Sequence, residues 1–193
     1  MRGGFGWRKR INIWDGRAFS NVNDNFANFS RWFNEPLLEL QQDSGAGFII
    51  VMTSLALLER YLREKSGVHE RPSLDKNFRT EFMRLFPSIG RDDLALKFWE
   101  VCRHGLMHQA TFKIKTNAGD RVTIGLHESA LEIVHRYGSS GDEFMISPSR
   151  FSSKVIQIIE NDFPTFEGSA SPNHPLSQIS SVSGYSGFSG HKR

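Results

Sequence analysis

Apolar residues recur at three- and four-residue spacing along most of the first hundred residues, which is the pattern of amphipathic helices. Pro36 falls inside the first of these stretches and predicts that this helix is kinked or divided. The second stretch is apolar almost all round at its start, as is typical of a central bundle helix. The pattern predicts four helices, at about 20–42, 47–65, 74–86 and 92–102, with Ser73 capping the third.

After residue 110 the apolar period changes from helical to alternating. Alternation over 112–116 and 122–126 predicts a β-hairpin, and 143–146 predicts a short strand, whereas 128–138 fits either a strand or a helix. Ser147 and Pro148 begin a closing helix as its N-cap and first residue. We therefore expect a mainly α fold, a helical bundle with a small antiparallel β insertion before the last helix.

Composition divides the chain into three parts. Residues 1–16 are basic and glycine-rich and are expected to be flexible, residues 17–166 form one domain with its β insertion at about 110–147, and residues 167–193 form a disordered Ser/Gly-rich tail. The net charge of +3 is too small to indicate a nucleic-acid partner by itself. A single cysteine, no apolar leader and no membrane-spanning stretch favour a cytoplasmic location without membrane contact.

The end of the fourth helix carries an arginine and a histidine, Arg103 and His108. Arginine offers phosphate a fixed, bidentate cation, and histidine can move a proton in either direction near neutral pH. In an ideal α-helix two residues five positions apart lie about 140° apart around the axis. The pair can therefore converge only if the helix breaks, with Gly105 as the expected break, or if a partner subunit contributes.

Arg103, His104 and His108 fit an Arg-x(4–6)-His pattern at its shortest spacing, with a polar residue directly after the arginine and Trp99 four residues before it. Together with the four helices, the β insertion and the closing helix, this segment resembles the HEPN superfamily. The resemblance implies a helical bundle that forms a homodimer and brings two Arg-His pairs into one cleft. Many members are metal-independent endoribonucleases of toxin or defence systems, often with a neutralising protein partner, and others are non-catalytic binding modules.

The chemistry of these residues suits RNA cleavage by 2′-hydroxyl attack. His108 would transfer the proton, Arg103 would stabilise the charge that develops on phosphorus, and His104 would orient its neighbours or contact the phosphate. Glu59 on the second helix could face inward and pair with Arg103, or form a surface ion pair with Arg63. Trp99 is a supporting aromatic residue, and neither a metal nor a cofactor is expected.

Two basic groups could guide RNA toward this site. Arg60 and Arg63 lie near the end of the second helix, and Lys113 and Lys115 share one face of the predicted hairpin. Each group could also be an ordinary solvated surface. The sequence thus predicts an endoribonuclease, with a non-catalytic RNA- or protein-binding module as the alternative.

Two other interpretations of the Arg-His segment stay open. Glu100, His104 and His108 are spaced four apart and would line one face of an unbroken helix as a metal stripe, although a fourth ligand is not evident. The arginine and histidine could instead be structural and bind the last carbonyls of their helix.

Overall fold

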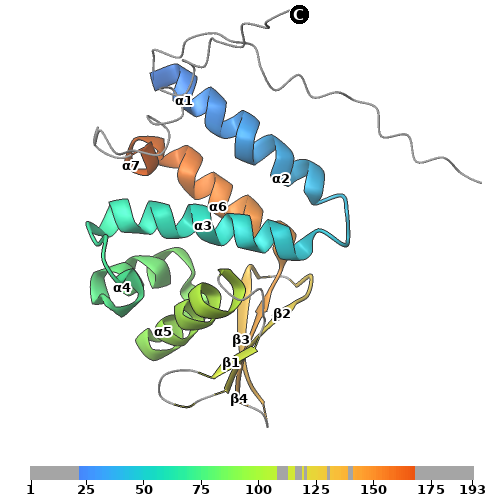
Figure 1. Ribbon diagram of the computed structural model, residues 1–193, viewed down its shortest axis with the longest axis vertical. Coiled ribbons are helices and arrows are strands. Elements are labelled where there is room, and N and C mark those ends of the chain that lie inside the picture. Colours follow the sequence, from blue (N-terminus) through green and yellow to red (C-terminus); the bar gives the residue numbers. More distant parts are fainter. Residues whose placement is uncertain are drawn as a thin grey trace, which may run out of the picture.

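A computed structural model describes residues 22–107, 113–115, 119, 121–129, 131–138 and 141–167 of the chain. Helices form most of the described part, and a small four-stranded sheet lies against one end of them (Figure 1). The mainly α class with a β insertion before the closing helices is therefore confirmed. In the described residues, no helix has both the length and the apolar character needed to cross a membrane.

The first helical segment is divided just before Pro36, as predicted. It consists of α1 (Val22–Phe29), a π turn (Ser30–Asn34) and α2 (Glu35–Leu40), and the Glu35 N–H donates to the Ser30 carbonyl five residues earlier. Proline has no N–H and its ring clashes with the preceding turn, so a wider turn before it relieves that crowding. Phe29 from α1 is fully buried and contacts the aromatic rings of the closing segment.

Helix α3 (Gly47–Ser66) runs through the middle of the helical body. It contacts α4 (Lys76–Leu85) on one side and α6 (Pro148–Asn161) with α7 (Phe163–Glu167) on the other (Figure 1). This arrangement explains its long apolar perimeter. The helix ends at Gly67, whose φ of 68° is the left-handed conformation that glycine adopts without strain.

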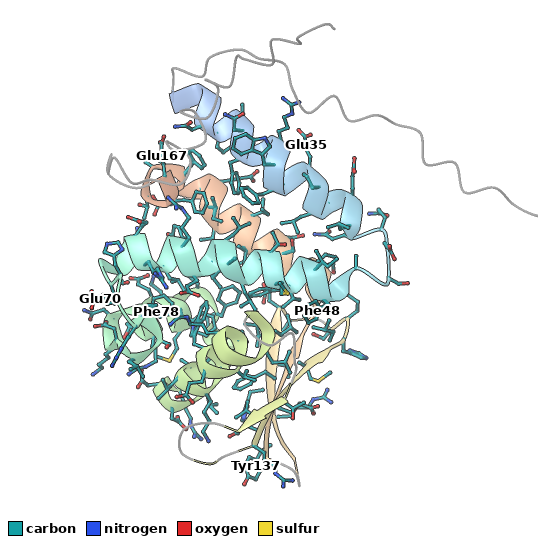
Figure 2. The ribbon with its side chains drawn as sticks, in the orientation of Figure 1. Glu35, Phe48, Glu70, Phe78, Tyr137 and Glu167 are labelled. Carbon is teal, nitrogen blue, oxygen red and sulfur yellow. The ribbon has the colours of Figure 1, made fainter. Side chains whose placement is uncertain are left out.

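Two short 3-10 turns, Pro72–Leu74 and Pro87–Ile89, flank α4, and α5 (Asp92–Glu100) follows the second turn. The predicted cap of α4 is wrong by two residues. Ser73 lies within the first turn, and the Asp75 carboxylate caps the helix by accepting from the Asn77 and Phe78 N–H groups. Figure 2 shows Phe78 in the region where α3, α4 and α5 meet.

The sheet has the strand order β1-β2-β4-β3. Its strands are β1 (Lys113–Lys115), β2 (Arg121–Leu126), β3 (Ile133–Gly138) and β4 (Gly141–Ile146), so the predicted hairpin is confirmed and part of the ambiguous 128–138 segment is a strand. The wholly antiparallel pairing is wrong at one place, because β2 and β4 are parallel. Strand β3 takes the outer edge and pairs antiparallel with β4, and β4 runs beside β2 in the same direction.

One face of the sheet is buried against α5 and its extension. Phe144 contacts Phe98 of α5 with ring centroids 5.3 Å apart, and the alternate positions of β2 and β4 on this side are buried. After β4, Ser147 precedes Pro148, the predicted first residue of α6. Ser147 occupies the N-cap position of α6, as predicted, but its hydroxyl makes no capping hydrogen bond. The hydroxyl donates instead to Glu128, which also accepts from the Ser149 hydroxyl.

Candidate functional site

Arg103 lies on a π-helical segment, Val101–Met107, which continues α5 directly. The predicted break at Gly105 is absent, because the π segment runs through this buried glycine. A π-helix bonds residues five apart rather than four, so residues at that spacing come toward the same side of the axis. The separation expected for an ideal α-helix therefore does not apply to this segment. His108 lies outside the described residues, and only the backbone of His104 is described.

The Arg103 side chain meets Glu59 and Arg63 of α3, and we call these three residues the carboxylate cluster. Glu59 is buried, with 8% of its side chain exposed, and a single oxygen of it receives both arginines. Arg63 contacts Glu59 Oε1 through Nε at 3.0 Å and Nη2 at 2.5 Å, and Arg103 Nε lies 3.3 Å from the same oxygen. Both predicted alternatives for Glu59, an inward pair with Arg103 and an i,i+4 pair with Arg63, thus occur together.

The two arginines of the cluster are held differently. Arg63 is fully engaged, because its Nη1 donates to the His69 carbonyl at 3.1 Å. Arg103 uses only Nε, and none of the described residues accepts a hydrogen bond from its Nη1 or Nη2. A quarter of the Arg103 side chain is exposed. Glu59 therefore restrains one edge of this guanidinium, and no described residue occupies the two Nη groups, which could bind an oxyanion in two-point fashion.

Trp99 and Cys102, which flank the site along α5 and its extension, belong to the core. Trp99 is fully buried among Phe78, Phe82 and Phe98, and its Nε1 has no hydrogen-bond partner among the described residues. Burial, with a smaller contribution from the nearby Glu59 charge, raises the pKa of the Cys102 thiol well above its usual value. Cys102 is therefore not an activated nucleophile.

The predicted RNA contacts lie in separate places. Arg60 is turned toward the end of α7, where it lies 5.1 Å from the Phe166 ring centroid and donates to the carbonyls of Phe166 and Glu167. Its role there is to hold α7. Lys113 and Lys115 lie on the edge strand β1, opposite Thr123 and Arg121.

The structure contains a second buried polar cluster, which the sequence did not predict. Asp142 of β4, with 7% of its side chain exposed, receives Lys97 Nζ at 2.8 Å on one oxygen and contacts His135 Nε2 at 2.7 Å through the other. Burial alone would raise the pKa of Asp142, but the hydrogen bonds from Lys97 and His135 outweigh burial and lower it. The three residues come from three elements, so no spacing along the chain could reveal them.

The metal-stripe interpretation depends on an unbroken α-helix through Glu100, His104 and His108. The helix changes from α to π at Val101, between Glu100 and His104, and His108 lies outside the described residues. Among the described residues, no group of three histidine, cysteine, aspartate or glutamate side chains is placed to hold a metal ion.

Comparisons of this chain with models of protein families, with curated proteins and with solved structures gave no match.

Proposed function

We propose that the protein is a metal-independent endoribonuclease of the HEPN type, with Arg103 as the phosphate-binding cation of its active site. The observation that carries the proposal is the way Arg103 is held. A buried carboxylate lies 3.3 Å from its Nε, no described residue accepts a hydrogen bond from its Nη1 or Nη2, and a quarter of the side chain is exposed, at the π-helical end of an amphipathic helix.

The reaction needs charge stabilisation and two proton transfers. His108 takes the proton of the ribose 2′-hydroxyl, the 2′-oxygen bonds to phosphorus, and the bond from phosphorus to the 5′-oxygen breaks. Arg103 stabilises the added negative charge on the phosphorus oxygens, and His104 orients its neighbours or contacts the phosphate. The products carry a 2′,3′-cyclic phosphate and a 5′-hydroxyl.

The leaving 5′-oxygen must receive a proton on the side opposite the attacking oxygen. One histidine cannot serve both sides of an in-line displacement, so a homodimer that supplies two copies of His108 fits this chemistry. A cytoplasmic toxin or defence role and a neutralising protein partner complete the proposal, on the basis of the resemblance to HEPN proteins.

The alternative is a non-catalytic binding module for RNA or protein. It is favoured by the ion pair that Arg103 already makes with Glu59, since a purely structural arginine would also be paired.

Cleavage by the purified full chain in EDTA separates these functions. We expect wild-type protein to cut a mixed RNA pool and leave 2′,3′-cyclic phosphate ends, whereas Arg103→Ala and His108→Ala should fail although they fold. Arg84→Ala and His127→Ala are matched controls on exposed residues, and they should cut normally. Salt-sensitive RNA binding without product from folded wild type would favour the binding module. Equal cleavage by wild type and both site variants would refute the assigned roles.

A further inference from the structure

The sheet presents one open face, opposite the face that α5 covers. In β2 and β4 the residues on the covered side are buried, apart from the half-buried Leu126, and the residues between them are half-buried or exposed. Among the described residues, no helix covers that second side, and Figure 1 shows the helices gathered on the other side of the sheet. Arg121 and Arg136 on this open face are exposed, so a ligand can reach them.

Basic residues gather on the open face. Arg121 of β2 and Arg136 of β3 are exposed, and neither guanidinium has an ion-pair partner among the described residues. The register places the positions of Lys113 and Lys115 on this same face, because they pair with Thr123 and Arg121 across β1 and β2. In the strands, the acidic residue on this face is Glu143, directly opposite Arg136. Four basic positions thus face one acid.

The positions between these charges are small or apolar. Gly125 lies in the middle of the face, and a Cβ placed there would meet Met145 Sδ at 2.6 Å, so the Met145 side chain lies across the glycine. Val134 of β3 lies directly opposite Met145. With a strand spacing of about 4.8 Å, the basic positions from β1 to β3 form a strip about 15 Å wide beside this apolar patch.

An exposed aromatic residue lies at the end of the strip. Tyr137 follows Arg136 on the edge strand β3, and 82% of it is exposed (Figure 2). Successive strand residues point to opposite faces, so a ligand that passes around the β3 edge can reach both side chains. Cations with an exposed ring fit single-stranded nucleic acid, which offers phosphates to the cations and bases to the ring.

We propose that the open sheet face and its β3 edge bind single-stranded RNA, with Arg121 and Arg136 contacting phosphates and Tyr137 stacking on a base. This inference rests on the proposed function and names the surface that supplies affinity for the substrate. It transfers the binding role from Arg60 and Arg63, which are engaged within the protein, to the sheet. Strands β1 and β2 contact the π segment that carries Arg103, so the two sites belong to one end of the molecule.

The test measures binding of a fluorescent 2′-O-methyl oligouridylate to the full chain in EDTA, at 50 to 200 mM salt. The probe cannot be cut by 2′-hydroxyl attack, so binding is separated from cleavage. Each lost phosphate contact makes the negative slope of log affinity against log salt shallower by about 0.7. Arg121→Gln with Arg136→Gln should therefore make the slope shallower by about 1.4 and weaken binding about 25-fold at 0.1 M salt. Tyr137→Ala should weaken binding about fivefold or more, and Tyr137→Phe should restore it.

The matched control is Arg84→Gln with Arg150→Gln, which removes the same charge from exposed positions on α4 and α6. This variant should bind the probe within about twofold of wild type if local contacts matter more than net charge. The proposed site would be refuted if both double variants weakened probe binding equally. It would also be refuted if polyglutamate or duplex RNA competed with the probe as strongly as single-stranded RNA does. Cleavage is measured in a separate assay. If the protein binds the probe but does not cut RNA, the proposed nuclease activity is refuted and the binding site is not. If the wild type cuts RNA and the sheet variants bind the probe with wild-type affinity, the binding site on the sheet is refuted and the nuclease activity is not.

Discussion

Replacing Arg63 by alanine should destabilise the fold more than replacing Arg103, although Arg103 is the residue proposed to act on RNA. The expectation follows from what each arginine does for the buried Glu59 carboxylate. Arg63 makes two short contacts to Glu59 and one to the His69 carbonyl, and Arg103 makes one contact at 3.3 Å. Removal of Arg63 leaves a buried anion with one weak partner, whereas removal of Arg103 leaves it with a strong one.

The magnitudes follow from these contacts. A hydrogen bond to a charged group contributes about 1.5–3 kcal/mol, and partial exposure of a partner reduces that value. We therefore expect Arg63→Ala to lower the free energy of unfolding by about 2–3 kcal/mol and Arg103→Ala by about 0.5–1 kcal/mol. RNA cleavage should show the opposite asymmetry, because the Arg63→Ala protein that stays folded keeps the reactive guanidinium.

Urea unfolding followed by far-ultraviolet circular dichroism measures the first quantity, and cleavage in EDTA measures the second. Arg103→Lys serves as the control, since it keeps the charge but not the two-point geometry, and it should keep stability while losing most activity. An Arg103→Ala loss of stability equal to or larger than that of Arg63→Ala would refute the assignment of Arg63 as the anchor.

Three further expectations concern the rest of the fold. Asp142→Asn should lower the free energy of unfolding by about 2–3 kcal/mol at pH 7. The folded state lowers the pKa of Asp142, so the stabilisation is present above the unfolded-state pKa and is lost as the pH falls through the folded-state pKa. The urea midpoint of the variant should therefore vary less with pH on the acid side than the midpoint of the wild type. Gly141→Ala should lower the free energy of unfolding, measured in urea, by more than about 2 kcal/mol, because Gly141 has a φ of +117° and the new Cβ would lie 2.3 Å from the Arg121 carbonyl oxygen. Gly125→Ala should lower it less, because the new Cβ would meet the flexible end of the Met145 side chain. Burial and the hydrogen bond to Asp162 raise the pKa of Tyr61 to about 12. Ultraviolet titration should therefore show one phenol that ionises late, and Tyr61→Phe should remove it. A wild-type curve in which all tyrosines ionise near pH 10 would contradict this packing.

The parts that the sequence predicted well depend on a single element. Pro36 divides its helix because the cause, a missing N–H, lies in the residue itself. The face of one helix allowed two alternatives for Glu59, an inward pair with Arg103 or an ion pair with Arg63, and the structure contains both.

The parts that it missed depend on how elements are placed relative to one another. The Asp142 cluster requires β4 to lie between β2 and β3. The alternation of apolar residues along one strand does not indicate the order of the strands in the sheet. Arg60 was expected to face RNA because α7 was not predicted. This helix has five residues, too few for a helical period to stand out, and its end captures the guanidinium.

The charge of the carboxylate cluster connects the fold to the proposed chemistry. Two arginines and one glutamate leave a net charge of +1, which one bound phosphodiester would neutralise. Without Glu59 the cluster would carry two uncompensated cations, and Arg103 would lose the contact that fixes its Nε. Without Arg63 the cluster would be neutral, and the phosphate would have to compete with a buried carboxylate for the one remaining arginine. Arg63 therefore strengthens the attraction for phosphate and Glu59 orients Arg103, but Arg103 is the group that meets the phosphate, and its loss should affect cleavage most.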